Sequence, residues 1–312
     1  MTPPSGGSTV DGMVGKDGPA GNEAMACEQP ATKEPLWKAI GRSSLVVIPT
    51  YNEVENLVPL VERVLGQEGF DVLVIDDSSA DGTGELADRL AAQFPGRISV
   101  LHRRAKLGLG SAITTGLRYA LHREYAYVFQ MDADLSHDPS TLPAMRRALE
   151  RVDIVVGSRY VAGAATLRRA PHRELLSRLA SVYARTVLGV PLSDPTGGYR
   201  GYRRQVLEAL DLDQVASSGY AVQVELNYRC HQAGFRFEEL PIAFRERDAG
   251  RSKMSLGIVL EGVFVVAMLR LTRTSADAAR QRGAQQRQTG PDADHQRQGR
   301  SIRSPELKEG SQ

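Results

Sequence analysis

Hydrophobic and polar positions alternate in blocks along the first half of the chain. Five short apolar runs, rich in β-branched residues, predict buried strands. They lie at 45–50, 71–75, 98–103, 125–132 and 153–160. The stretches between them repeat apolar residues at three- and four-residue intervals, which is typical of amphipathic helices. This alternation predicts a mostly parallel α/β sheet flanked by helices, with functional residues at the carboxyl ends of the strands.

The pattern changes after residue 160. RELLSRLASVYARTVLG (173–189) predicts a helix, and LSDPTGGYRGYRRQVLEAL (192–210) predicts a turn followed by a helix. YAVQVELNYRCHQAG (220–234) predicts a further helix, and FRFEELPIAFRER (235–247) predicts one strand. The folded domain is therefore expected over residues 44–253.

The two ends of the chain have a different composition. Residues 1–43 are rich in Gly, Pro, Ser and Ala, and residues 272–312 are polar, with many Gln and Arg. Neither can bury enough apolar surface to offset the entropy of ordering, so both are predicted to be disordered tails. The net charge of +2 lacks the basic bias of a nucleic-acid-binding protein. The two cysteines, Cys27 and Cys230, permit no disulfide framework, which favours a reducing, cytoplasmic setting.

The segment MSLGIVLEGVFVVAMLRL, at 254–271, is almost entirely apolar. It is short for a membrane-spanning helix and carries Glu261 near its centre. A buried core helix is one interpretation, but we prefer an amphipathic helix lying on a membrane surface. Four flanking cations would then lie among lipid headgroups: Arg251, Lys253, Arg270 and Arg273. The predicted location is the cytoplasmic face of the cell membrane, with the protein bound peripherally.

Pairs of carboxylates follow two of the predicted strands. Asp76 and Asp77 follow the second strand, and Asp132 and Asp134 follow the fourth. Residues two apart in an extended chain project to the same side, so Asp132 and Asp134 would repel each other without a cation between them. Turn formation explains one such pair well and both pairs poorly. The pattern favours a site for a hard divalent cation, Mg²⁺ or Mn²⁺, that bridges to phosphate oxygens.

Basic residues follow in the second half of the chain. Arg159 closes the fifth strand, Arg173 lies at the start of a helix, and Arg247 and Lys253 bracket a Gly-containing loop. Each alone could be a solvated surface charge, but together they favour phosphate binding. The segment GLGSAI at 108–113 lacks the third glycine of a dinucleotide fingerprint, which favours turn chemistry and argues against a nicotinamide dehydrogenase.

Seven segments carry a family resemblance. They occur within residues 44–256 in the order VVIPTYNEVENL, VLVIDDSSADGT, LGLGSAITTGL, MDADLSHDP, VVGSRYV, SDPTGGYRGYRR and RERDAGRSKM. The Asp-x-Asp pair alone is a weak signal, whereas the ordered set is specific. The set resembles the family 2 glycosyltransferases of GT-A fold, and within them the dolichol-phosphate or polyprenol-phosphate mannose synthases. The expected fold class is therefore α/β of the GT-A type, followed by C-terminal amphipathic helices at the membrane interface.

The resemblance implies roles for the matching positions. The guanosine and ribose of GDP-mannose would lie against Pro49, Tyr51, Glu53, Ile75 and Asp77. The diphosphate and the metal would meet Asp132, Ala133 and Asp134. The acceptor phosphate would be held by Arg159, Arg173 and Ser177, and a mobile loop with Arg247 and Lys253 would close over the donor. Asp132, Asp134 and Arg159 are the implied catalytic residues. Ser136 replaces a Gln that is a further metal ligand in some relatives, so either Ser136 or a water would take that position.

The implied reaction is inverting transfer of mannose from GDP-mannose to a polyprenyl phosphate, of the dolichyl-phosphate β-D-mannosyltransferase type. The nucleophile would be a phosphate monoester, largely dianionic at neutral pH because its second pKa is about 6, so no strong base is needed. The enzyme would lie on the membrane or dock onto a separate membrane-spanning partner protein.

Three alternatives stay open. The first is a UDP-glucose-dependent polyprenyl-phosphate glucosyltransferase of the same fold, and the second is a non-catalytic nucleotide-binding regulator. The third is a transferase that builds polysaccharide, with Asp194 as its general base. For Asp194 we prefer the interpretation of a turn carboxylate before Pro195.

Overall fold

The computed structural model of the chain describes five stretches. They are residues 43–167, 170–217, 219, 221–245 and 261–271. The predicted tails, apart from Ser43, and residues 254–260 of the predicted interface helix lie outside the described residues.

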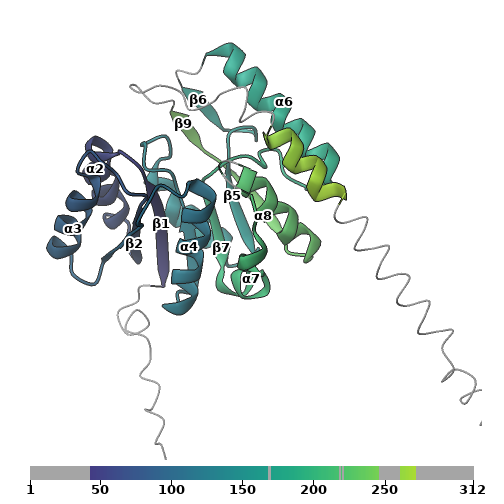
Figure 1. Cartoon of the computed structure of the whole chain (residues 1–312). Coiled ribbons are helices and arrows are strands. Elements are labelled where there is room, and N and C mark those ends of the chain that lie inside the picture. Colours follow the sequence, from purple (N-terminus) through teal and green to yellow (C-terminus); the bar gives the residue numbers. More distant parts are fainter. Residues whose placement is uncertain (1–42, 168–169, 218, 220, 246–260, 272–312) are drawn as a thin grey trace, which may run out of the picture. The chain divides into compact units, whose positions relative to one another are not determined.

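A seven-stranded sheet forms the centre of the domain (Figure 1). Its order is β3-β2-β1-β4-β7-β5-β8, and every strand pair is parallel except those made by β7. The strands are β1 (Ser44–Thr50), β2 (Phe70–Asp76), β3 (Ile98–His102), β4 (Tyr127–Gln130), β5 (Ile154–Ser158), β7 (Arg200–Arg203) and β8 (Phe237–Pro241). The mostly parallel sheet and its flanking helices confirm the predicted fold class.

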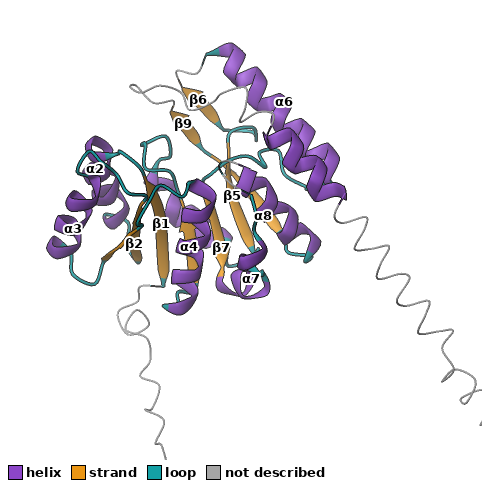
Figure 2. Ribbon diagram, in the orientation of Figure 1, coloured by secondary structure: helices purple, strands orange, loops and turns teal. Residues whose placement is uncertain are grey.

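Helices cover both faces of this sheet, as the secondary-structure view in Figure 2 shows. The core on one face includes side chains of α2 (Val54–Leu65), α3 (Thr83–Gln93) and α5 (Leu142–Ala148). The core on the other face includes side chains of α4 (Leu109–His122), α6 (Pro171–Leu188), α7 (Arg204–Ala209) and α8 (Ala221–Gln232). In β1, Leu45 and Val47 point to the second core, and Val46 and Ile48 to the first. Such two-sided burial explains the continuous apolar runs of the sequence.

The prediction for residues 192–210 was wrong in one respect, because a strand lies between the turn and the helix. This strand, β7, runs antiparallel between β4 and β5. Its sequence RGYR lacks the apolar run of a central strand. Arg200 is fully buried there, and its guanidinium donates to the carbonyl oxygens of Pro195, Gly197 and Gln223 and to the side chain of Asn227.

The stretch 235–247 also differs from the single strand that was expected. β8 belongs to the large sheet, whereas β9 (Ala243–Arg245) pairs with β6 (Ala165–Leu167) in a separate two-stranded sheet. Pro241 ends β8, consistent with proline's inability to donate a ladder hydrogen bond. Short 3₁₀ helices lie at Pro139–Thr141 and Leu212–Gln214.

Residues 261–271 form a helix that runs beside α6 (Figure 1). The Tyr183 hydroxyl of α6 donates to the carbonyl oxygen of Val263 at 3.2 Å. Val266 is buried in the second core, while Phe264 on the same helix is 65% exposed. The described part of this helix is therefore amphipathic, with one face packed on the domain.

Candidate functional site

The candidate donor residues lie where the strand order of the sheet reverses. The chain proceeds from β1 to β2 and β3 on one side, and β4 pairs with β1 on the other side. In open α/β sheets, ligands bind outside the carboxyl ends of strands at such a reversal. Tyr51 and Glu53 follow β1, and Asp132 and Asp134 follow β4. The fold therefore brings these four predicted residues to one end of two adjacent strands.

Hydrogen bonds within the turn after β4 fix the positions of Asp132 and Asp134. The backbone N–H of Asp132 donates to Nδ1 of His137 at 3.3 Å, and Asp134 Oδ1 accepts from the N–H of Ser136 at 3.1 Å. Leu135, which follows Asp134, has a φ of 60°, a conformation that non-glycine residues rarely adopt and that often marks functional turns. His137 is buried, and its ring stacks on Tyr199 at 5.0 Å between centroids.

Two consecutive glycines lie against the acidic residues. A Cβ added to Gly198 would lie 3.2 Å from each carboxylate oxygen of Asp132. A Cβ added to Gly197 would lie 3.4 Å from Oδ2 of Asp194. The backbone at 197–198 therefore passes close to both carboxylates, and a side chain at Gly198 would press on Asp132. This segment physically connects the Asp-x-Asp turn with the surroundings of Arg159.

Asp77 is used by the protein itself to shape a neighbouring loop. Its carboxylate accepts from the backbone N–H groups of Leu107 and Gly108 at 2.9 and 2.8 Å, and Arg103 forms an ion pair with it at 3.0 Å. Gly108 has a φ of 90° and precedes α4. The GLGSAI segment is therefore a helix-opening turn, as its sequence indicated.

The loop that Asp77 shapes also reaches Tyr51. The ammonium of Lys106 lies 3.8 Å from the centroid of the Tyr51 ring, a cation–π contact. Glu53 is buried, and its Oε2 accepts from the Asn56 side chain at 2.9 Å. Pro49 of β1 pairs in register with Ile75 of β2, so these two predicted donor residues lie side by side.

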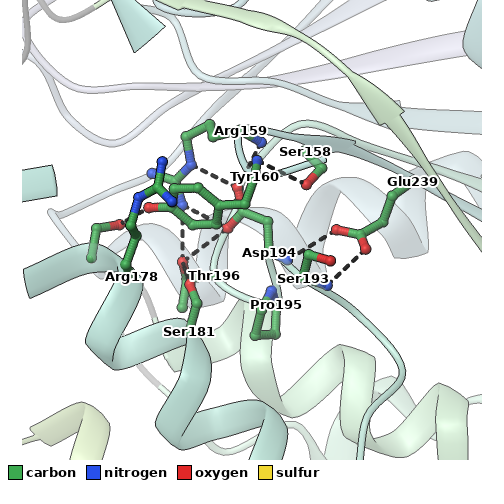
Figure 3. A network of polar contacts seen from close by, with 12 residues as sticks. Ser158, Arg159, Tyr160, Arg178, Ser181, Ser193, Asp194, Pro195, Thr196 and Glu239 are labelled. Carbon is green, nitrogen blue, oxygen red and sulfur yellow. Dashed lines mark hydrogen bonds and ion pairs between the residues drawn. The ribbon is translucent and has the colours of Figure 1, made fainter. Parts of the chain in front are cut away.

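Arg159 lies directly after β5 and forms a buried, two-pronged ion pair with Asp194 (Figure 3). Its Nε and Nη2 donate to Oδ2 and Oδ1 of Asp194 at 2.6 and 2.7 Å, and Nη2 also donates to Thr196 Oγ1 at 2.9 Å. Burial alone would raise the pKa of Asp194, but the hydrogen bonds and charge of Arg159 outweigh it and hold that pKa below its usual range. Asp194 is therefore an ionised carboxylate paired with the guanidinium of Arg159, which makes it a poor general base.

A second arginine and a tyrosine adjoin this pair. The Tyr160 hydroxyl donates to Ser177 Oγ at 2.7 Å, and the Arg159 and Arg178 guanidinium carbons lie 5.2 and 5.0 Å from the centroid of its ring. A serine oxygen that accepts from Tyr160 keeps its own proton free to donate. The predicted acceptor residues Arg159 and Ser177 are thus connected through Tyr160, and Arg173 lies on the first turn of α6.

The loop with Arg247 and Lys253 lies outside the described residues. The last residue described before it, Arg245, donates its backbone N–H to the carbonyl oxygen of Ser136 at 3.2 Å. The end of β9 therefore lies beside the Asp-x-Asp turn.

Metal-binding capacity at this site rests on two carboxylates. No group of three or more His, Cys, Asp or Glu side chains suited to a metal occurs in the part of the chain that the structure describes. A cation that binds through one or two carboxylates, substrate phosphates and water needs no larger group, and Mg²⁺ typically binds in this way. Ser136 Oγ is buried beside Asp134 and has no hydrogen-bond partner among the described residues. The site therefore fits such a cation.

Several residues at the site were missed by sequence reasoning. They are His137, Tyr160, Arg178, Thr196, Gly197, Gly198 and Glu239. The motif MDADLSHDP contained His137, and SDPTGGYRGYRR contained the two glycines, but nothing local to either motif indicated their contacts. Glu239 lies in a strand with no motif.

Comparisons with known proteins identify the family of the chain. A family model described as glycosyl transferase family 2 matches residues 45–211. The chain is 46% identical over 252 residues to a polyprenol monophosphomannose synthase of Mycolicibacterium smegmatis, covering 80% of this chain and 93% of that one. It is also 46% identical over 220 residues to an undecaprenyl-phosphate mannosyltransferase of Micrococcus luteus, covering 70% of this chain and 90% of that one.

Solved structures show the same fold at lower identity. Glucosyl-3-phosphoglycerate synthase from Mycobacterium tuberculosis, in complex with Mn²⁺, uridine diphosphate and glucosyl-3-phosphoglycerate, matches with a TM-score of 0.53 at 21% identity. The match covers 76% of this chain and 82% of that one. The same enzyme with Mg²⁺ and uridine diphosphate gives a TM-score of 0.54. These likenesses confirm the predicted GT-A fold.

Proposed function

Because the chain belongs to glycosyl transferase family 2, we propose that it transfers mannose from GDP-mannose to a membrane polyprenyl phosphate, with inversion at the anomeric carbon. The product would be a polyprenyl-phosphate-mannose, a lipid-linked mannose donor. The observation that carries this proposal is the 46% identity that spans 93% of a polyprenol monophosphomannose synthase. The predicted site residues from Pro49 to Ser177 lie within residues 45–211, which the family model matches.

The donor half of the proposed site lies at the ends of β1 and β4. Asp132 and Asp134 would hold Mg²⁺ or Mn²⁺, and the buried hydroxyl of Ser136 is available to a water in the same shell. A bound divalent cation supplies positive charge that stabilises a leaving diphosphate. The protein's own part is orientation: His137 fixes the backbone of Asp132, and Gly198 allows its carboxylate to approach.

The acceptor half is the cluster around Arg159. A phosphate monoester nucleophile needs no general base, and Asp194 is already paired with Arg159. Arg159, Arg173 and Ser177 would instead bind the acceptor dianion and offset its repulsion from the donor diphosphate. The low pKa of Asp194 also disfavours the alternative in which this residue activates a sugar hydroxyl.

An exposed apolar surface supports action at a membrane. Large hydrophobic side chains project from α6 at Leu175, Leu176, Leu179 and Val182, and from the 261–271 helix at Val263, Phe264, Met268 and Leu271. These two neighbouring helices are here called the apolar helix pair. No helix among the described residues is both long and apolar enough to cross a membrane. We propose that the apolar helix pair contacts the cytoplasmic membrane surface, either alone or with a membrane-spanning partner protein.

The test is a transfer assay with purified full-length protein, labelled GDP-mannose and short- or long-chain prenyl phosphates, with and without a chelator. We expect GDP release and label in the lipid, both abolished by the chelator. Asp134→Ala should lower kcat/KM by at least about 100-fold, the scale of removing one transition-state charge contact. Asp213→Ala is a matched control, because Asp213 is exposed and pairs only with Arg118 at the surface in the described structure.

Other outcomes separate the alternatives. Release of UDP from UDP-glucose, with no turnover of GDP-mannose, would establish the glucosyltransferase instead. Nucleotide binding without turnover of either donor would favour a regulatory binding protein. Transfer to a sugar hydroxyl rather than to a prenyl phosphate would favour a polysaccharide-building enzyme.

A further inference from the structure

Two carboxylates, rather than one, support the position of Arg159: Asp194 binds it directly, and a second carboxylate binds the backbone of Asp194 (Figure 3). The second belongs to Glu239 of β8, whose Oε2 and Oε1 accept from the backbone N–H groups of Ser193 and Asp194 at 2.7 and 2.9 Å. A carboxylate that receives two consecutive backbone N–H groups fixes the orientation of that peptide segment. Glu239 therefore holds the turn from which the Asp194 side chain reaches Arg159.

The strands give this arrangement a rigid base. β8, which carries Glu239, pairs in parallel with β5, and Val156 lies opposite Glu239 in the register. Arg159 follows the last residue of β5. The turn at 193–194 is thus tied to β8 through Glu239 and to the end of β5 through Asp194. The Arg159 backbone N–H adds a further bond, to Asp194 Oδ2 at 3.1 Å.

These contacts leave one edge of the guanidinium for a ligand. Arg159 has five N–H donors, and its bonds to Asp194 and Thr196 use Nε and Nη2. Among the described residues, none accepts a hydrogen bond from Nη1 of Arg159. An arginine held on one edge by a carboxylate presents its other edge in a fixed plane, which suits a tetrahedral phosphate.

We propose that Glu239 and Asp194 act as positioning residues for Arg159, so that its Nη1 edge is aimed at the acceptor phosphate. In this scheme Glu239 orients the 193–194 turn, Asp194 orients the guanidinium, and neither touches the substrate or accepts its proton. The inference rests on the proposed function, since it deepens the role given there to Arg159.

Three variants test the scheme in the full-length protein. Glu239→Gln replaces one acceptor oxygen by an amide donor facing a backbone N–H, and Asp194→Asn does the same facing Arg159. Thr196→Val leaves both carboxylates in place and removes the bonds that Thr196 Oγ1 makes with Arg159, Asp194 and Ser181, so it keeps the test open if either carboxylate variant does not fold. Glu238→Gln is the matched control, because Glu238 neighbours Glu239 on β8 but pairs with the exposed Arg151.

The readouts are KM for a short-chain prenyl phosphate, KM for GDP-mannose, kcat and the melting temperature. We expect Glu239→Gln and Asp194→Asn to raise the acceptor KM by about 10- to 100-fold, the range for losing a hydrogen bond to a charged group. Thr196→Val should raise it less, and the donor KM should stay within about twofold of wild type in all three. Glu238→Gln should match wild type in every parameter.

Two results would overturn the inference alone. If the variants lower only the melting temperature and leave the acceptor KM unchanged, the network is a structural clamp. If Asp194→Asn lowers kcat with an unchanged acceptor KM, Asp194 acts on the chemical step instead. A wild-type protein that transfers no mannose to any prenyl phosphate would overturn the proposed function and this inference together, whereas the two results above leave the proposed function intact.

Discussion

Arg159 and Asp194 show how far a residue's surroundings decide its chemistry. Their side chains are 10% and 0% exposed, and the bidentate geometry compensates each for its lost water. The sequence favoured a turn carboxylate at Asp194 and left a general base as the alternative. The partner responsible for the observed role is 35 positions away, and no local pattern connects the two residues. Asp132 and Asp134, by contrast, directly follow β4, so their location at the end of this strand was predictable from the sequence, whereas the turn at 133–135 that replaces the expected extended chain was not.

The buried pair predicts a specific response to acid. The folded-state pKa of Asp194 lies below its unfolded value of 3.8, so its contribution to stability is present above pH 3.8 and is lost as pH falls through the folded-state pKa. At neutral pH, Asp194→Asn should lower the free energy of unfolding by about 3–5 kcal/mol, because it leaves Arg159 without its counter-charge. Below pH 3.8 the difference between variant and wild type should shrink.

Urea unfolding of both proteins across this acid range measures that difference. Asp213→Asn serves as the control, since Asp213 is 86% exposed and its variant should follow the wild-type curve at every pH. A constant gap between wild type and Asp194→Asn down to the lowest pH would show that ionisation of Asp194 contributes nothing.

At the scale of elements, the sequence was informative wherever burial produced a simple period. β1 to β5 and α4 follow from apolar runs and helical spacing, because both faces of a parallel sheet are covered. β7 was missed because its central place depends on contacts from other elements. Arg200 is solvated there by carbonyl groups from its own turn and from α8, and Gly201 lies against Phe129 of β4 and Val155 of β5.

The contact of α4 with β1 and β2 gives a prediction at this scale. Gly116 lies in the middle of α4, where glycine costs about 1 kcal/mol relative to alanine. A Cβ at this position would clash with Val47 and would lie 2.8 Å from Cδ1 of Ile75. Gly116→Ala should therefore destabilise the protein by about 1–3 kcal/mol, because overpacking outweighs the gain in helix propensity.

Gly262→Ala provides a comparison within another helix. An added Cβ there would meet nothing within 4 Å, so propensity should decide and the variant should be neutral or stabilised by up to about 1 kcal/mol. The two denaturation midpoints, measured together, test the argument. Equal stabilisation by both alanines would mean that α4 can move away from the sheet freely.

At the scale of the whole molecule, the sequence identified an apolar segment at 254–271 but not its companion. α6 was expected as a helix, but its exposed leucines form one apolar surface with the 261–271 helix only because the two helices lie side by side. Because of this pairing, a deletion of residues 254–312 would not test membrane contact alone. Such a truncation removes the buried Val266 as well as the exposed side chains, so it would disturb the core and the surface together.

Point substitutions on the apolar helix pair separate these effects. Leu175 and Phe264 are 60% and 65% exposed, so Leu175→Ser combined with Phe264→Ser should leave the core intact. Each side chain buried in lipid contributes about 1.5–3 kcal/mol, so the double variant should bind vesicles at least about 100-fold more weakly. Transfer to a long-chain prenyl phosphate in vesicles should fall with binding, whereas transfer to a soluble short-chain acceptor should persist. Leu107→Ser, which alters an equally exposed leucine outside the pair, should bind vesicles like wild type, and undiminished binding by the double variant would exclude the apolar helix pair as the membrane-contacting surface.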